Sequence, residues 1–387
     1  MNPMPMSETR TGERRRIVVA MSGGVDSSVA AALLVDQGHE VIGMMLRLWS
    51  EPGTGTSASA NRCCTPDQMA DARRVADRLG IPFYVVDAQQ HFRQAIVQFF
   101  IREHEAGRTP NPCVECNRQI RFTYLLERAM ALGADYLVTG HYARVSQVGG
   151  KYRLLQGLDS NKDQSYVLYT LRQDQLARVF FPIGDYAKPE VRDLARQYGL
   201  LVASKRESQD LCFLKDGDYR RFLRENSLQV QAAGPILDED GHELGQHEGL
   251  AFYTIGQRKG LGIAAAEPLF VLRKDLERNA LIVGPRAALG VRDLVATGVN
   301  WISGEVPAAP FLAQVKIRYK ATALEATVWP IGTDQAKVRF AEPAFGVTSG
   351  QAAVFYDGEA CLGGGLIAND QALEIMAEGE RSEEYAL

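Results

Sequence analysis

The fold is decided by the stretch Ala20-Met21-Ser22-Gly23-Gly24-Val25-Asp26-Ser27-Ser28. It follows the apolar run Ile17 to Met21, which predicts a buried strand, and it opens a stretch with helical spacing, Ser27 to Gln37. A turn rich in glycine and serine between a strand and a helix exposes several backbone N–H groups and hydroxyls beside the helix N-terminus. The stretch therefore predicts a phosphate-binding loop.

Two other common phosphate motifs do not fit this loop. A Walker A loop requires a lysine and a dinucleotide fingerprint requires G-x-G-x-x-G, and neither is present here. The alternative without a ligand is a glycine-rich turn that merely caps a helix. The pattern Ser-Gly-Gly-x-Asp-Ser after a strand resembles the PP-loop family, whose members split ATP into AMP and pyrophosphate to adenylate an oxygen.

Strand and helix patterns alternate from this loop to Thr139. Further strands are expected at Val41 to Leu46, Phe83 to Val86 and Tyr136 to Thr139, and further helices at Pro66 to Leu79 and Arg118 to Leu132. Gly38, Gly80 and Gly133 each follow a helical stretch, as expected of helix C-termini. The alternation predicts an α/β fold with a doubly wound parallel sheet, whose ligands lie at the carboxyl ends of the strands.

The pattern changes after about Asp218 to short strands separated by glycine-rich turns, and from about Arg292 it is almost wholly β. We therefore expect a disordered N-terminal tail over residues 1–15 and a PP-loop ATP-binding and catalytic domain over 16–217. A small, mostly β central domain over 218–290 and a C-terminal β-barrel over 291–380 should follow.

Length and composition are those of a soluble protein with several domains. The 387 residues exceed the size at which one core usually keeps growing, and 46% of them are hydrophobic. No apolar run approaches the roughly 20 residues of a membrane span, and Met1 to Arg16 lacks the apolar core of a signal peptide. We expect a cytoplasmic protein without a membrane partner. The net charge of -4 does not by itself favour nucleic acid, although basic runs such as Arg258-Lys259 could gather on one face or simply be solvated.

The six cysteines are too few for a secreted disulfide scaffold. Cys113 and Cys116 form a C-x-x-C pair, and Asn117 is a plausible N-cap that would place Cys116 at a helix start, where the helix dipole lowers a thiol pKa. Metal ligation, a redox pair, catalysis and chance all fit this spacing. Cys212 has cationic neighbours in Lys205-Arg206, which favour a thiolate, but a cysteine between Leu and Phe is more often a buried core residue.

Taken together, the motifs resemble the bacterial tRNA-specific 2-thiouridylase family over nearly the whole chain. The matching segments are Ser22 to Ser27, the Trp49 region, Thr109 to Phe122, Thr139 to Tyr142, Lys162 to Ser165, Ser208 to Phe213, Gly256 to Gly262, and Gly350 to Tyr356. The resemblance implies that the wobble uridine in the anticodon loop of certain tRNAs is converted to 2-thiouridine. It also implies ATP with Mg²⁺, a tRNA-binding helical part in the first domain, and sulfur from a cysteine desulfurase or a sulfur-relay protein.

The same resemblance assigns roles to individual residues. ATP would contact Ala20, Met21, Ser22, Gly23, Gly24, Val25, Asp26, Ser27, Leu46 and Gly140. The target base would be framed by Asn111, Pro112 and Cys113, and tRNA would be contacted by His141, Lys162, Asp163, Gln164, Arg318, Tyr319 and Gln351. Cys212 would carry a persulfide, and Cys116 would be the nucleophile that releases the sulfur through a transient disulfide. Alternatively, Arg318 and Tyr319 belong to a barrel strand, and His141 is an ordinary loop histidine.

Cys113 departs from the family pattern, because many members carry Asp there. That Asp is sometimes assigned to proton transfer, a role that a thiol puts in doubt. The set of Cys113, Cys116 and Cys212 also resembles the three ligands of a [4Fe-4S] cluster in related tRNA thiolases, which leaves the cluster as an alternative. Cys63, Cys64 and Cys361 match no assigned role.

Two other functions are compatible with parts of the pattern. Another PP-loop ligase or amidotransferase would adenylate a small carboxylate or amide, and it would not need Cys116 and Cys212. A redox or metal-binding protein with a tRNA-binding barrel would not turn over ATP. ATP turnover and the need for the two cysteines therefore distinguish the three functions.

Overall fold

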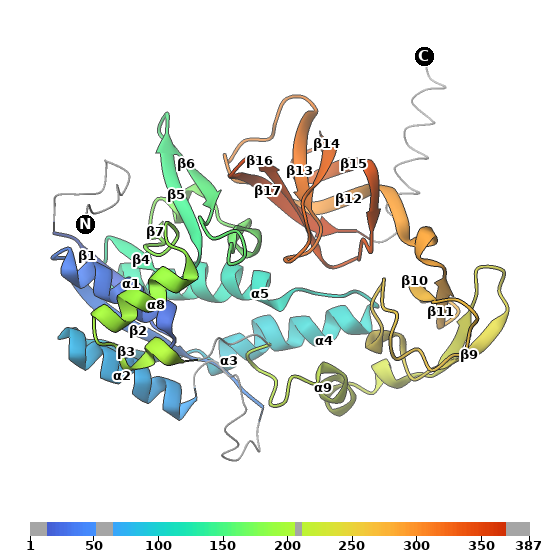
Figure 1. Ribbon diagram of the computed structural model, residues 1–387, viewed down its shortest axis with the longest axis horizontal. Helices are drawn as coiled ribbons and strands as arrows, with labels where there is room; N and C mark the ends of the chain where they lie inside the picture. Colours follow the sequence, from blue (N-terminus) through green and yellow to red (C-terminus); the bar gives the residue numbers. More distant parts are fainter. Residues whose placement is uncertain (1–13, 52–64, 206–210, 369–387) are drawn as a thin grey trace.

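The computed structural model describes residues 14–51, 65–205 and 211–368. Most of the expected N-terminal tail lies outside these ranges, as do Cys63, Cys64 and the segment 206–210. The molecule is elongated, with a parallel sheet at one end, a small mixed sheet at the other, and a barrel between them on one side (Figure 1). Within the described residues, no helix is long and apolar enough to cross a membrane.

The N-terminal sheet is parallel, with strand order β3-β2-β1-β4-β7. Its strands are β1 (Arg16–Ala20), β2 (Glu40–Arg47), β3 (Phe83–Asp87), β4 (Tyr136–Val138) and β7 (Val179–Phe180). Helices cover both of its faces, because alternate residues of β1 enter different cores. Ile17 and Val19 pack with α1 (Val25–Asp36), α2 (Pro66–Leu79) and α8 (Lys188–Gln197), whereas Val18 packs with the helices on the other face. The predicted doubly wound sheet is therefore confirmed.

The helices on the second face form two long runs that lie side by side (Figure 1). One consists of α3 (Gln89–Phe92), η1 (Arg93–Val97) and α4 (Gln98–Glu105), and the other of α5 (Pro112–Glu115), η2 (Cys116–Leu125) and α6 (Leu126–Ala131). Shorter helical turns follow at η3 (Ser165–Leu168), α7 (Gln173–Leu176) and η4 (Leu201–Ser204). Gly38, Gly80 and Gly133 all have positive φ, which confirms them as helix stops.

The central region begins with α9 (Tyr219–Asn226) and contains a four-stranded sheet of order β10-β11-β8-β9. Its strands are β8 (Gly234–Leu237), β9 (Glu243–His247), β10 (Phe270–Asp275) and β11 (Ala280–Gly284). The remaining helical turns are η5 (Gln229–Gln231), η6 (Leu250–Phe252) and η7 (Arg286–Leu289). The strand pair β11–β8 is parallel and the other two pairs are antiparallel.

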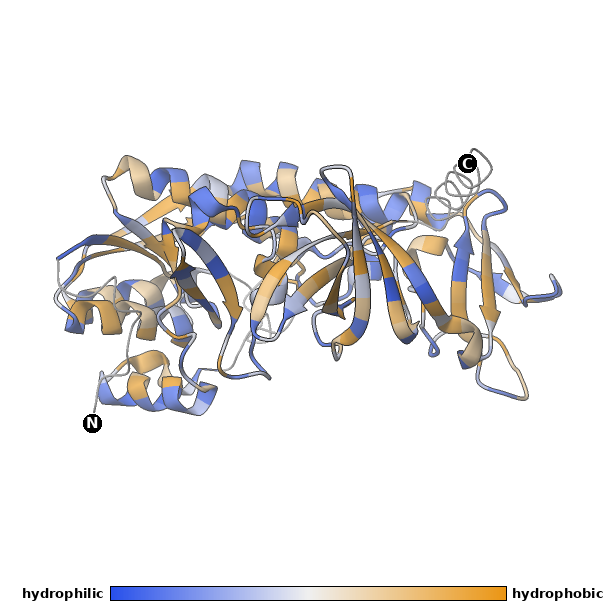
Figure 2. Ribbon diagram, turned by 90° about the horizontal axis from the view of Figure 1, so that it is seen from above, coloured by the Kyte–Doolittle hydropathy of each residue, from blue (hydrophilic) through white to orange (hydrophobic). Residues whose placement is uncertain are grey.

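The C-terminal region is a six-stranded antiparallel barrel, as predicted. Its strands are β12 (Gly290–Trp301), β13 (Phe311–Lys316), β14 (Leu324–Ile331), β15 (Gln335–Phe345), β16 (Ala352–Asp357) and β17 (Ala360–Ile367). They follow the order β12-β15-β14-β13-β16-β17, and pairing of β12 with β17 closes the barrel. Hydrophobic and polar residues alternate along these strands, as expected of strands that turn one face to a core (Figure 2).

A hairpin from the first part of the chain extends the barrel sheet. It consists of β5 (Ala143–Val148) and β6 (Lys151–Gln156), and β6 pairs with β17 through Leu155 opposite Ala360 and Leu154 opposite Cys361. The sequence patterns did not predict this pairing, because its two partners lie about 200 residues apart. The hairpin joins the nucleotide-binding end of the molecule to the barrel.

Candidate active site

The glycine-rich loop lies where the strand order of the parallel sheet reverses. Strand β1 has β2 on one side and β4 on the other, so the loops that follow β1 and β4 meet at the carboxyl edge of the sheet. Gly140, which follows β4, touches the start of α1, since a Cβ atom there would lie 2.6 Å from the backbone nitrogen of Ser27. The structure therefore brings Gly140 and the loop together, as the resemblance implied.

The loop has a backbone that suits an anion. Gly23 has φ of 70°, and a Cβ atom on it would lie 2.2 Å from the carbonyl oxygen of Gln68, so only glycine fits there. Gly24 is the N-cap of α1 and supplies no side-chain hydrogen bond to the first turn of this helix. The backbone N–H of Ser22 donates to Ser27 Oγ at 3.2 Å, which folds the loop over the helix start. Backbone N–H groups at such a helix start can bind phosphate oxygens.

Two lysines border this loop, and the sequence analysis did not assign either of them to it. Lys188 Nζ donates to both carboxylate oxygens of Asp26, at 2.6 and 2.8 Å, and Tyr142 donates its hydroxyl to the same carboxylate at 2.8 Å. Lys205 Nζ donates to the carbonyl oxygen of Gly23 at 2.9 Å and to Asp71 at 2.6 Å. A lysine within the loop would have been visible as a Walker motif, but Lys188 is 162 residues from Asp26 in sequence.

A cavity of about 530 Å³ opens at the carboxyl end of β2. It is lined by Arg47, Leu48, Ser50, Pro66, Met69, Ala70, Arg73 and Gln89. The buried Leu46 lies next to this lining in the strand, and Gln68, which touches Gly23, lies next to it in α2. The volume is within the range of small-ligand pockets, and its place beside the loop suits the nucleoside part of a nucleotide.

The helix that carries Cys113 and Cys116 begins earlier than predicted. The expected N-cap, Asn117, is wrong: Asn117 lies inside the helical run, is buried, and donates its side-chain amide to the carbonyl oxygen of Val167 at 3.0 Å. The cap is Asn111, whose Oδ1 accepts the backbone N–H of Cys113 at 3.1 Å. The argument from the helix dipole therefore applies to the exposed Cys113, in the first turn, and not to the buried Cys116.

Cys116 and Cys212 share one core. Cys116 is 5% exposed within the large core cluster, and the half-buried Cys212 packs against the same cluster. Residues 211–218, the described part of the segment around Cys212, form no helix or strand, and Phe213 anchors them with ring centroids 5.4 Å from Phe100 and 5.7 Å from Phe222. The expectation that Cys212 is a buried core residue is thus only partly confirmed, because its side chain packs on the core but is half-exposed.

His141, expected to contact tRNA, lies in the interior. Its Nδ1 is 2.6 Å from Thr139 Oγ1, and its ring packs against Phe122 and Phe181 with centroids at 5.8 Å. Burial, with a smaller contribution from Arg121, lowers the pKa of His141 to about 3. The imidazole is therefore neutral at physiological pH and supports the core behind the site.

Asp163 and Gln164 also bond within the protein. The Asp163 carboxylate accepts the backbone N–H of Gly157 at 3.1 Å and both the N–H and the hydroxyl of Ser165 at 3.0 Å, and Lys316 Nζ lies 3.5 Å away. Gln164 Oε1 accepts the backbone N–H of Tyr142 at 2.9 Å, and Lys162, which precedes Asp163 in sequence, is half-buried. These side chains shape the loop after β6 and join it to the barrel.

The remaining predicted tRNA contacts lie at the edge of the barrel nearest the Cys113 helix. Strand β13 ends at Lys316, so Arg318 and Tyr319 follow the strand instead of belonging to it, and Arg318 donates to the carbonyl oxygen of Phe345 at 3.1 Å. Gln351 donates its amide to the carbonyl oxygen of Thr109 at 2.7 Å. The barrel therefore contacts the segment that leads to Asn111 and Cys113.

The iron–sulfur alternative gains no support from the structure. Cys113 is exposed, Cys116 is buried and Cys212 is half-buried. Among the described residues, the group of potential metal ligands that lie within 4.8 Å of one another is Asp238, Asp240 and His242, on the turn between β8 and β9. None of the three cysteines belongs to that group, and we assign no cluster.

Three family models match consecutive parts of the chain. Residues 15–216 match the tRNA methyl transferase HUP domain, residues 220–285 match the tRNA methyl transferase PRC-barrel domain, and residues 291–367 match the aminomethyltransferase beta-barrel domain. The glycine-rich loop, both lysines beside it and all three cysteines discussed above fall in the first of these ranges.

Known relatives are similar over almost their full length. The tRNA-specific 2-thiouridylase MnmA of Roseiflexus castenholzii is 50% identical over 371 residues, which cover 92% of this chain and 100% of the relative. The enzyme of the same name from Geobacter metallireducens is 51% identical over 357 residues, covering 92% and 97%. A solved complex of a 4-thiouridine synthetase with RNA and bound ATP covers 55% of this chain and 50% of its own, at 16% identity and a TM-score of 0.34. That last likeness is too slight to carry an argument.

Proposed function

Because this chain belongs to the tRNA-specific 2-thiouridylase MnmA family, we propose that it replaces the 2-oxygen of a tRNA wobble uridine with sulfur in an ATP-dependent reaction. The observation that carries the proposal is the meeting of the glycine-rich loop with Gly140 at the switch point of the sheet, in a chain that is about half identical to thiouridylases throughout. A phosphate loop at this place suits a nucleotide substrate.

In the first step, the uridine O2 attacks the α-phosphorus of ATP and pyrophosphate leaves. Backbone N–H groups at the start of α1 would hold the departing phosphates, and Lys188 and Lys205 lie close enough to the loop to neutralise part of their charge. Mg²⁺, which ATP chemistry generally requires, would be held mainly by phosphate oxygens. Asp26, the carboxylate within the loop, already accepts bonds from Lys188 and Tyr142.

In the second step, the terminal sulfur of a persulfide on Cys212 attacks C2 of the adenylated base, and AMP leaves with the oxygen. The thiolate of Cys116 then attacks the Cys212 sulfur and breaks the S–S bond to the base. That bond's electron pair stays on the base as the new thiocarbonyl, and a Cys116–Cys212 disulfide forms. An external thiol must reduce this disulfide before the next turnover.

The test is nucleoside mass spectrometry of tRNA incubated with ATP, Mg²⁺, a persulfide donor and the full-length protein. We expect 2-thiouridine with the wild type and none with Cys116→Ala or Cys212→Ala, whereas AMP release should continue with both variants. Cys361→Ala is the matched control, because Cys361 is buried in strand β17 and burial raises its pKa to about 12. Full thiolation by Cys212→Ala would overturn the mechanism.

The rest of the assignment follows from this proposal. We propose that the residues named above contact tRNA and the target base, and that the domains cover residues 16–217, 218–290 and 291–380. The β5–β6 hairpin bridges the first of these domains and the barrel. A cysteine desulfurase or a relay protein would supply sulfur, and the reaction would take place in the cytoplasm, where tRNA is used.

A further inference from the structure

The segment that carries Cys212 is bonded by one buried residue, Glu51, through both its backbone and its carboxylate. Glu51 follows β2 and is 6% exposed. Its backbone N–H donates to the carbonyl oxygen of Phe213 at 3.4 Å, and its Oε2 accepts the backbone N–H of Lys215 at 2.9 Å. One residue therefore bonds the main chain one and three positions after Cys212.

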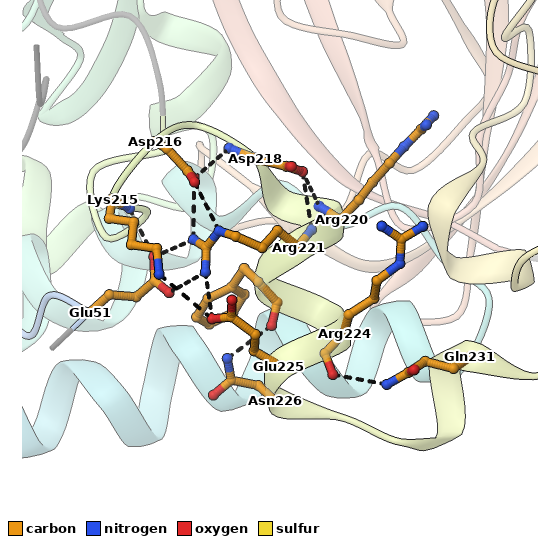
Figure 3. A network of polar contacts seen from close by, with 11 residues as sticks. Glu51, Lys215, Asp216, Asp218, Arg220, Arg221, Arg224, Glu225, Asn226 and Gln231 are labelled. Atoms are coloured by element: carbon orange, nitrogen blue, oxygen red, sulfur yellow. Dashed lines mark hydrogen bonds and ion pairs between the residues drawn. The ribbon is translucent and has the colours of Figure 1, made fainter. Parts of the chain in front are cut away.

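Arg221 completes this arrangement from α9. Its guanidinium donates to both oxygens of Glu51, at 3.0 and 2.8 Å, and also to Asp216 at 2.8 Å (Figure 3). Burial by itself would raise the pKa of Glu51, but the bonds from Arg221 and from the Lys215 backbone outweigh it and lower the pKa. The bidentate pair is therefore charged on both sides, and it fixes orientation as well as distance.

The pair is hard to explain by stability alone. Replacing a buried ion pair by apolar residues of similar size is often neutral or stabilising, so such a pair is weak support for a role in stability. The Cys212 segment has no helix or strand, and its apolar anchor, Phe213, fixes its depth in the core. The Glu51–Arg221 pair adds a directional link to the end of β2, where Ser50, next to Glu51, lines the 530 Å³ cavity beside the phosphate loop.

We propose that Glu51 and Arg221 are positioning residues that hold the Cys212 segment in register with the nucleotide end of β2, so that sulfur reaches the base after adenylation. This inference rests on the proposed function. Without the pair, adenylation would proceed, but the persulfide would be displaced from the activated base. The adenylated uridine would then react with water, which releases AMP and restores the 2-oxo group. The measurable effect of the pair is therefore on the number of AMP molecules released per 2-thiouridine formed, which we call the coupling of the two steps.

The experiment compares Glu51→Gln and Arg221→Met with wild type in the full-length protein. We expect the turnover number for 2-thiouridine to fall about 10- to 100-fold, the loss typical of a displaced reactive group. AMP release and the KM for ATP should change less than about twofold, so the AMP formed per 2-thiouridine rises. A second measurement uses no substrate: iodoacetamide alkylation of Cys212 and Cys113 is followed by peptide mass spectrometry. In both variants, the rate for Cys212 relative to that for Cys113 should be several times the wild-type ratio.

Glu225→Gln is the matched control. Glu225 bonds the same guanidinium at 2.5 Å from the solvent side, but it meets the Cys212 segment through the Lys215 side chain, at 3.8 Å, whereas Glu51 bonds the main chain of that segment. It should retain wild-type coupling and alkylation. The double variant Glu51→Leu/Arg221→Leu separates positioning from stability: we expect it to melt near the wild-type temperature and still be uncoupled. Restored coupling in that double variant, or wild-type coupling in Glu51→Gln, would overturn the inference.

Failure of the proposed function would look different. A wild-type protein that makes no 2-thiouridine rejects the function, while the alkylation of Cys212 still reports whether Glu51 and Arg221 position the segment. Unchanged Cys212 alkylation in both single variants then rejects the positioning role by itself.

Discussion

Cys116 and Cys212 lie in segments that are held in different ways. Cys116 is part of one helical run from Pro112 to Ala131, whose backbone bonds its own turns and whose start is capped by Asn111. Residues 211–218, which include Cys212, form no helix or strand; Glu51, after β2, bonds their main chain, and Arg221 of α9 bonds the Glu51 carboxylate. The structure thus combines a cysteine held within a helix, which suits a nucleophile of fixed position, with a cysteine whose segment is held by the apolar anchor Phe213 and by bonds from Glu51.

This difference implies different sensitivity to substitution. A helix distributes its stability over many backbone bonds, so that no single side chain controls the place of Cys116. The Cys212 segment depends on Glu51, which is buried and carries charge, so the loss of its partner has a large cost. Variants at Arg221, His141 and Asn111 test that contrast.

Arg221→Leu should have the largest effect on stability. It leaves the Glu51 carboxylate buried without its bidentate partner, and we expect a loss of about 3 kcal/mol in the free energy of unfolding. Urea unfolding of the full chain measures this loss. The Glu51→Leu/Arg221→Leu double variant should recover most of it. A single-variant loss below about 1 kcal/mol would mean that water or another cation replaces Arg221.

Acid should destabilise the core beside the Cys116 helix, through His141, before it affects the Glu51–Arg221 pair. The pKa of His141, about 3 in the folded chain, lies below the unfolded value of 6.5, so unfolding takes up a proton and stability falls as the pH drops below about 6.5. The loss attributable to His141 should be about 2 kcal/mol at pH 5. The pKa of Glu51 is lowered in the folded chain from its ordinary value of 4.5. Its contribution to the free energy of unfolding is therefore fully present above pH 4.5 and is lost as the pH falls through the lower, folded-state pKa.

The measurement is urea unfolding from pH 8 to pH 5 for wild type and for His141→Gln, which cannot titrate. The difference between the two proteins isolates His141, because the pKa of the buried His104 is also lowered to about 3 and acts equally in both. Parallel stability curves for the two proteins over this range would contradict the prediction.

Asn111→Ala should have the smallest effect. The variant loses the cap of the Cys113 helix, which typically costs about 1 kcal/mol. Iodoacetamide should then alkylate Cys113 more slowly than in wild type, because fraying of the first turn weakens the helix dipole that favours its thiolate, while the rate for Cys212 stays the same. Asn111→Asp is the control, because an aspartate oxygen can still accept the backbone N–H of Cys113. A change at Cys212 would show that the two segments are not independent.

Local sequence patterns were enough to predict the strands and helices that depend on neighbouring residues. The strands near Ile17, Val41, Phe83 and Tyr136, the helix over Pro66 to Leu79 and the glycine stops all occur as predicted, because hydrophobic spacing and positive φ are properties of neighbouring residues. The phosphate loop was visible for the same reason. The prediction that Asn117 caps the helix was wrong. Asn111 and Asn117 both precede stretches that can form a helix, and packing decides that Asn117 is buried inside the helical run while Asn111 caps it.

Only the tertiary structure decided the contacts that join distant residues. Lys188 reaches Asp26 across 162 residues, Arg221 reaches Glu51 across 170, and β6 pairs with β17 only when the barrel is closed. Such contacts leave no periodic signal in the chain, and a lysine or glutamate that forms one looks in sequence like any solvated charge. Burial and hydrogen-bond geometry select the partner, and both exist only once the separate elements pack together.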